Sequence, residues 1–242
     1  MKINIEIEKA DIERVERLIE ETKMHPIVIE RKNRNINNSK NQIGREKFWR
    51  GVLVGLFTSV QKSGAESAVS KFLNLDPHPL SVENCVSSKN MADYVRNECT
   101  KFGGIRRYNK IAEQIKYNLE LLKNTDWKIL NQINQRLPTD NYKIEEEIAG
   151  ELTSLKGIGS KQSRNIIQNL GLTRFEIPID SRLMKWINSE ISFPIKLTSA
   201  GLQDENYYCF VLSAIRKLSS EAGIFPCELD AMIFSTFEKV NK

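Results

Sequence analysis

Apolar residues recur at helical spacing along most of the chain after residue 43. Ile144, Ile148 and Leu152, for example, stand four residues apart and would share one face of a helix. Prolines at 77, 79, 138, 178, 194 and 226 separate the periodic stretches, because proline is poorly tolerated inside a helix. The pattern predicts helices at about 44–62, 64–73, 89–102, 107–122, 126–136, 144–154, 161–170, 180–188, 204–222 and 226–239.

The N-terminal residues show a different pattern. Residues 2–8 alternate polar and apolar side chains, which predicts a strand, residues 11–22 have helical spacing, and residues 27–30 are a short apolar run typical of a second strand. Residues 34–41 form a polar linker. We therefore expect a mainly α fold, with a small β-containing N-terminal appendage at 1–42 and a two-lobed helical domain at 43–242.

Two glycines separate the expected helices at 144–154 and 161–170. Glycine permits the positive φ of a tight turn and a close approach to its backbone, so the amides of Gly157 and Gly159 could be exposed. They would open onto a helix N-terminus, where unpaired N–H groups and the helix dipole favour a phosphate. Lys156, Lys161 and Arg164 add positive charge. A helix–hairpin–helix that binds DNA is one interpretation, and an ordinary glycine-rich connection is the other.

Two further residues suggest chemistry at this hairpin. Lys161 lies in the first turn of a helix, where the dipole disfavours a cation, and a lysine with more neutral amine can form a Schiff base. Asp180 precedes the helix expected at 180–188, so it is a candidate helix cap and a candidate catalytic carboxylate. A solvated lysine and a plain cap are the structural alternatives.

These segments resemble a known family. The stretch from Leu155 to Gly171, followed by Ile177-Pro178-Ile179-Asp180, is similar to the signature of the helix–hairpin–helix (HhH-GPD) DNA glycosylases related to endonuclease III and 8-oxoguanine DNA glycosylase. Phe48-Trp49-Arg50 with Thr58-Ser59, and Gly104–Glu113, look like other conserved parts of that fold. The tail Cys227-Glu228-Leu229-Asp230, ending at Lys242, resembles the second, mostly archaeal, 8-oxoguanine DNA glycosylase family.

The resemblance implies a site and a reaction. Lys161 would attack the sugar C1′ and Asp180 would assist, giving base excision with β-elimination at the abasic site. The remaining residues divide by role: a DNA-binding set of Lys156, Gly157, Gly159, Ser160, Arg164 and Gln61, and a base pocket of Trp49, Phe234 and Lys242. Gln61 stands one residue after the position of the family's plug glutamine, and a core aromatic is the alternative role for Trp49 and Phe234. The partner would be double-stranded DNA that contains a damaged base, with 8-oxoguanine favoured, bound by a monomer.

Composition agrees with this interpretation. The net charge of +5 is modest, so clusters of basic residues matter more than the total. Neither a long apolar run nor a signal-peptide pattern occurs, which predicts a soluble intracellular protein in the cytoplasm or nucleoid. The cysteines at 85, 99, 209 and 227 do not have iron–sulfur or zinc spacing, so we expect catalysis without a metal or cofactor, with room for a monovalent ion at the hairpin.

Two other functions stay open at this stage. One is a monofunctional glycosylase in which Asp180 activates water and Lys161 is incidental. The other is a non-catalytic protein that uses the hairpin only to bind DNA.

Overall fold

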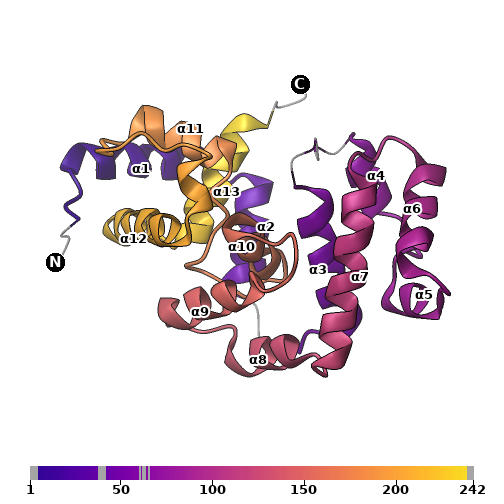
Figure 1. Ribbon diagram of the computed structural model, residues 1–242. Coiled ribbons are helices and arrows are strands. Elements are labelled where there is room, and N and C mark those ends of the chain that lie inside the picture. Colours follow the sequence, from indigo (N-terminus) through magenta and orange to yellow (C-terminus); the bar gives the residue numbers. More distant parts are fainter. Residues whose placement is uncertain (1–4, 38–41, 60, 62–63, 65, 239–242) are drawn as a thin grey trace. The chain divides into compact units, whose positions relative to one another are not determined.

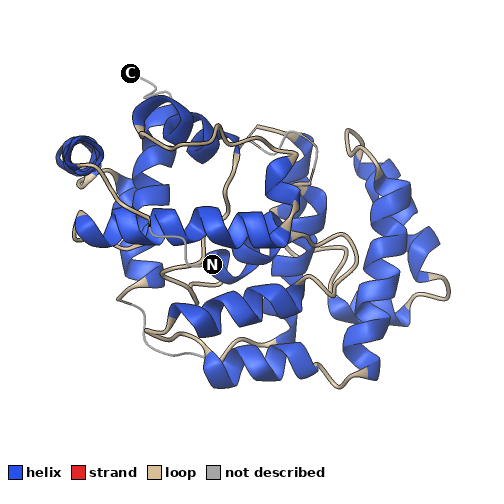
Figure 2. Cartoon of the chain, turned by 60° about the vertical axis from the view of Figure 1, so that its left-hand side comes forward, coloured by secondary structure: helices blue, strands red, loops and turns tan. Residues whose placement is uncertain are grey.

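The computed structural model describes residues 5–37, 42–59, 61, 64 and 66–238. In these residues every regular element is a helix, and Figure 2 shows no strand among them. The chain forms two compact units, in which unit 1 comprises residues 1–40, 137–149 and 171–242, and unit 2 comprises 41–136 and 150–170. The helices (Figure 1) are α1 (Lys9–Thr22), α2 (Pro26–Asn35), α3 (Arg45–Phe57), α4 (Ala68–Leu73), α5 (Val82–Ser87), α6 (Met91–Phe102), α7 (Tyr108–Asn124), α8 (Lys128–Arg136), α9 (Tyr142–Leu152), α10 (Ser160–Asn169), α11 (Ser181–Glu190), η1 (Gly201–Gln203), α12 (Glu205–Glu221) and α13 (Pro226–Phe237).

The β-containing N-terminal appendage is wrong. The strand expected at 27–30 lies inside α2, and residues 5–8 of the other expected strand are not in a strand, while residues 2–4 lie outside the described residues. The His25 side chain accepts a hydrogen bond from the amide of Ile27, and Pro26 occupies the start of the helix, where it is tolerated. Val28, Arg31 and Asn35 are then buried along one helical face. The helix expected at 11–22 is confirmed as part of α1.

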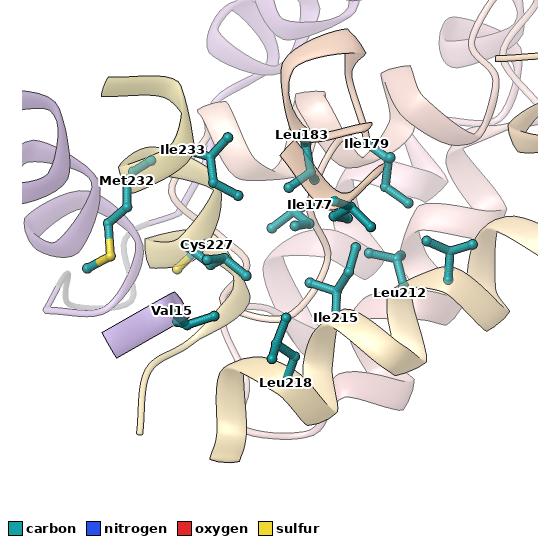
Figure 3. Close-up of a cluster of buried hydrophobic side chains, with 14 of the residues drawn as sticks. Val15, Ile177, Ile179, Leu183, Leu212, Ile215, Leu218, Cys227, Met232 and Ile233 are labelled. Atoms are coloured by element: carbon teal, nitrogen blue, oxygen red, sulfur yellow. The ribbon is translucent and has the colours of Figure 1, made fainter. Parts of the chain in front are cut away.

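Helices from both ends of the chain build the core of unit 1. Val15 of α1 packs in one apolar cluster with side chains of α11, α12 and α13, and Figure 3 shows this cluster around Ile177 and Ile179. Arg31 of α2 also forms a buried ion pair with Asp230 of α13, at 2.6 Å. The N-terminal helices are therefore an integral part of unit 1.

Unit 2 is organised around α3. This helix packs against α7 and α10, and Figure 1 shows α3 and α7 running side by side. Gly51 and Gly55 lie on the face of α3 that meets α10, where a Cβ on Gly55 would come within 3.0 Å of Ile158 and 3.4 Å of Ile166. The absence of these side chains lets the two helices approach closely, which fixes α10 against the core of the unit.

Most of the expected helices after residue 43 are present, with ends that differ by a few residues. The first is shorter than expected, because α3 ends at Phe57 and not near residue 62. The short helix α5 was missed, since its six residues are too few for a helical repeat of apolar positions to be visible.

Candidate active site

Hydrogen bonds from α7 fix the turn before α10. Asn118 of α7 accepts a hydrogen bond from the amide of Lys156 at 2.7 Å and donates one to its carbonyl at 3.0 Å. Gly157 has a φ of +88°, and a Cβ there would lie 2.3 Å from Nε2 of Gln114 and 2.9 Å from a methyl group of Leu56. Only glycine suits both this backbone conformation and this close approach. The turn is therefore a fixed part of unit 2.

Gly159 is different from Gly157. Its φ of −105° and ψ of −172° are extended, so the expected need for a positive φ applies to Gly157 alone. No atom lies within 4 Å of the position that a Cβ on Gly159 would take. Gly159 is the N-cap of α10 and supplies no side-chain cap, and the first turn of α10 contains no acidic residue. The opening amides of this helix thus have no side-chain cap, and a helix N-terminus of this kind favours an anion.

Lys161 is exposed in the first turn of α10. Among the described residues, its side chain makes no ion pair or hydrogen bond. The dipole of α10 disfavours a positive charge at this point. An exposed amine therefore lies next to backbone N–H groups that have no side-chain cap.

Lys156 is also exposed, and its ammonium group lies 5.2 Å from the centre of the Tyr117 ring. Ser160 and Arg164 are placed differently from the expectation. Ser160 is buried, and Arg164 is fully buried with its guanidinium on the carbonyl of Ser160 and the hydroxyl of Ser163, both at 3.3 Å. The Arg164 guanidinium is therefore enclosed in unit 2 and is not offered at the surface.

Asp180 caps α11 as the alternative interpretation proposed. One carboxylate oxygen accepts the amides of Arg182 at 2.8 Å and Leu183 at 3.0 Å. The other accepts Nε of Arg182 at 2.9 Å and Nη2 at 2.7 Å. The side chain of Asp180 keeps 17 % of its surface exposed. The carboxylate is therefore fixed by four N–H donors and can still be reached from solution.

The segment that leads to Asp180 is fixed by two buried groups. The Tyr208 hydroxyl accepts the amide of Ile179 at 2.6 Å and donates to the carbonyl of Ile177 at 3.1 Å. Glu145 of α9 accepts hydrogen bonds from the Thr173 hydroxyl and from three successive amides, those of residues 174–176. Burial raises the pKa of Glu145 to about 7, although these hydrogen bonds act in the opposite direction. Buried groups of unit 1 thus fix the backbone segment that positions Asp180.

The expected base-pocket and plug residues belong to different units. Trp49 is fully buried in unit 2 and its indole N–H donates to the carbonyl of Leu80 at 2.9 Å, so it is a core residue and presents no surface to a base. Phe234 is half-buried in unit 1 under the guanidinium of Arg182, which lies 3.9 Å from the ring centre. Gln61 donates to the carbonyl of Phe57 and accepts the amide of Arg106. Lys242 and Val60 lie outside the described residues.

Sequence reasoning missed Arg182, which links Asp180 to Phe234. An arginine two residues after an aspartate cap can fold back onto the carboxylate, and that spacing is visible in the sequence. It also missed Asn118, because a buried asparagine in the middle of a long helix gives no sign of its distant partner.

Three of the four cysteine side chains are buried. All four are free, and burial raises the pKa of the Cys85 and Cys99 thiols to about 12. Within the part of the chain that the structure describes, no group of three or more His, Cys, Asp or Glu side chains could hold a metal ion. No helix in that part combines the length and apolar character needed to cross a membrane.

Comparisons with known proteins agree with this description at the level of the fold. No protein-family model matches the chain, and no curated protein matches it. The crystal structure of the 8-oxoguanine DNA glycosylase of Thermotoga maritima superimposes with a TM-score of 0.65 and 18% sequence identity, over 96% of this chain and 98% of that chain. The chain therefore shares its fold with a DNA glycosylase, and the resemblance suggested by the sequence is confirmed at that level.

Proposed function

We propose that this protein is a base-excision DNA glycosylase with an associated abasic-site lyase activity. Its substrate would be double-stranded DNA with an oxidised base, and 8-oxoguanine is the favoured lesion. The observation that carries the proposal is the local geometry of Lys161, an exposed amine in the first turn of a helix whose opening amides have no side-chain cap. It is supported by the fold shared with a glycosylase over nearly the whole chain.

The turn at 156–160 supplies the DNA contact in this proposal. A backbone phosphate would accept hydrogen bonds from the open amides at the start of α10, with the charge of Lys156 nearby. Such a contact sets register and carries no sequence information, which suits an enzyme that must inspect any sequence. It would also bring the sugar of the lesion to the amine of Lys161.

The chemistry begins with a flipped nucleotide, since the glycosidic bond cannot be reached inside the stack. Unstacking costs a few kcal/mol, on the order of 2 to 4, and least for a damaged pair. The neutral Lys161 amine then bonds to C1′ while the bond from C1′ to the base breaks. The amine gives up a proton as the base leaves, and the sugar ring then opens when the bond from C1′ to O4′ breaks and O4′ takes up a proton. The protonated imine formed between C1′ and Lys161 allows loss of a proton from C2′ and departure of the 3′ phosphate. No cofactor enters the proposed steps.

Asp180 serves as a fixed negative charge in this scheme. Its carboxylate stabilises the positive charge that develops on the sugar as the base departs. Arg182 holds the orientation of the carboxylate, through two N–H groups on one oxygen.

Borohydride trapping tests the proposal. The protein is incubated with duplexes that carry 8-oxoguanine, an oxidised pyrimidine or an abasic site, and the imine is reduced to a stable adduct. We expect an adduct in the wild type that disappears in Lys161→Gln and persists in the matched control Lys116→Gln, an exposed lysine of α7. Base release without an adduct would support the monofunctional alternative, in which Asp180 activates water.

The lesion panel also tests the substrate. The 8-oxoguanine duplex should give the fastest base release, and a preference for the oxidised pyrimidine would refute that part of the proposal while leaving the lyase chemistry intact. Binding with neither release nor adduct on any duplex would refute the enzyme.

A further inference from the structure

A polar cavity lies between the turn before α10 and the first turns of α7, within unit 2. Its volume is about 250 Å³, and it shares Gly157 with the turn that precedes α10. The other polar residues of its lining are Ser59, Arg107, Lys110 and Gln114, with Leu56 as part of the apolar wall. None of these side chains entered the proposed chemistry.

The cavity concentrates positive charge. Arg107 and Lys110 are both exposed, and in the described part of the chain neither of them forms an ion pair. Arg107 is also the N-cap of α7, which has 17 residues, no side-chain cap and no acidic residue in its first turn. The helix dipole therefore adds to the two cations at the same point, and Lys110 stays in a first turn where that dipole disfavours it.

Gln114 is an independent indication that the cavity binds a ligand. Only 9 % of this residue is exposed, it faces the cavity, and within the described residues its amide makes no hydrogen bond. The amide atoms of Gln114 are not among the fully enclosed polar atoms that lack a partner, so they stay open to a group that enters the cavity. Its Nε2 group lies directly under Gly157, so a group that entered the cavity would meet the Gln114 amide at its floor.

The backbone conformation of Arg107 also supports a ligand site. Its φ of +58° and ψ of +18° lie in the left-handed region, which a residue with a side chain rarely adopts. Such conformations persist where the surrounding structure imposes them, and they cluster at ligand sites. A glycine would suit the turn better, yet the chain carries an arginine there.

We infer that this cavity binds a phosphate group of the DNA backbone, separate from the phosphate at the N-terminus of α10. Two cations, a helix N-terminus and an amide donor around one small space fit a compact anion better than a neutral base. Two phosphate sites that share Gly157 would hold consecutive parts of one strand and fix the direction in which it crosses unit 2. The DNA part of this inference depends on the proposed function.

The test measures the salt dependence of binding to an undamaged duplex, so that no chemistry is involved. The double variant Arg107→Asn and Lys110→Gln removes both cations, and asparagine is among the residues that tolerate the left-handed backbone. Loss of one phosphate contact should lower the slope of log Kd against log salt by about 0.9. Lys116→Gln, an exposed lysine of α7 outside the cavity, is the matched control and should leave the slope unchanged.

A second measurement uses inorganic phosphate as the probe on the wild type. Titration should shift the NMR signal of the Gln114 side-chain amide, and the double variant should lose that shift. An unchanged slope in the double variant, or an unshifted amide in the wild type, overturns the inference.

Borohydride trapping on the abasic duplex separates the two proposals. Trapping with an unchanged slope refutes the second phosphate site alone. A changed slope with no trapping by any duplex refutes the lyase and leaves the site standing.

Discussion

The two glycines of the turn before α10 should respond to alanine in opposite ways. Gly157 has a positive φ of +88° and lies against Gln114 and Leu56, whereas Gly159 is extended and open. Gly157→Ala should therefore damage the fold of unit 2. Gly159→Ala should leave the fold intact and remove a DNA contact, because its new methyl group would stand between the helix amides and a phosphate.

The magnitudes follow from the geometry. A left-handed conformation costs a residue with a Cβ about 1–2 kcal/mol, and relief of the contacts at 2.3 and 2.9 Å adds about 1–2 kcal/mol as an overpacking cost. Gly157→Ala should thus lose roughly 2–4 kcal/mol of unfolding free energy, or about 5–15 °C in the midpoint of the thermal transition that includes unit 2. Gly159→Ala gains from a less flexible unfolded chain and loses as a weaker cap, for a net change within about 1 kcal/mol.

Thermal unfolding by circular dichroism and duplex binding by fluorescence anisotropy measure the two effects. Gly159→Ala should weaken binding to damaged and undamaged duplexes alike, by about tenfold, which corresponds to the loss of one good hydrogen bond. An equal loss of stability in the two variants would refute the geometric argument. A binding defect in Gly159→Ala that is confined to one lesion would refute the phosphate contact.

Three further predictions concern single side chains. Arg182→Ala should slow base release, and it should lower the free energy of unfolding by less than about 1 kcal/mol because the ion pair with Asp180 is partly exposed. An unchanged rate in single-turnover assays would show that Arg182 does not orient the carboxylate. Asn118→Ala should lower the free energy of unfolding, measured with denaturant, by about 2 kcal/mol, because it removes two hydrogen bonds and leaves the Lys156 amide without a partner. Asn118→Asp should restore only the hydrogen bond that the Lys156 amide donates. Burial lowers the pKa of His78 from 6.5 to about 4. Between these two pH values the folded state therefore binds fewer protons than the unfolded state. The free energy of unfolding should fall as the pH drops from 6.5 towards 4, by about 2 kcal/mol at pH 5. The non-titrating His78→Asn can still accept the amide of Leu80 and should flatten this dependence; the same slope in both proteins would contradict the assignment.

The helical part of the fold could be predicted because burial and spacing coincide there. Ile148 and Leu152 are fully buried on one face of α9, as their spacing indicates. The same rule failed at residues 27–30 because three successive apolar residues do not reveal a period. The period becomes visible only when Arg31 and Asn35 are included as buried residues, and both are polar groups whose partners, Asp230 and the Thr173 carbonyl, lie more than a hundred residues away in the sequence.

The site could be predicted to a similar extent and for a similar reason. The local features of Lys161 and Asp180, a place in a first turn and a place at a cap, follow from the residues next to them in the sequence. Trp49 and Arg164 could not be placed, because the sequence does not show which distant segments surround an aromatic ring or a guanidinium. Their burial comes from packing between distant segments, and sequence spacing does not encode it.

The hydrogen bonds of Asp180 separate two roles that the sequence left open. A carboxylate has about four acceptor positions, and four N–H groups already fill them. A water molecule could be activated only after one of these bonds is broken, and a proton received by the carboxylate would weaken its pairing with Arg182. A fixed negative charge needs neither change. Within the proposed mechanism Asp180 is therefore better suited to stabilise a cationic sugar than to act as a general base, and the nucleophile falls to Lys161.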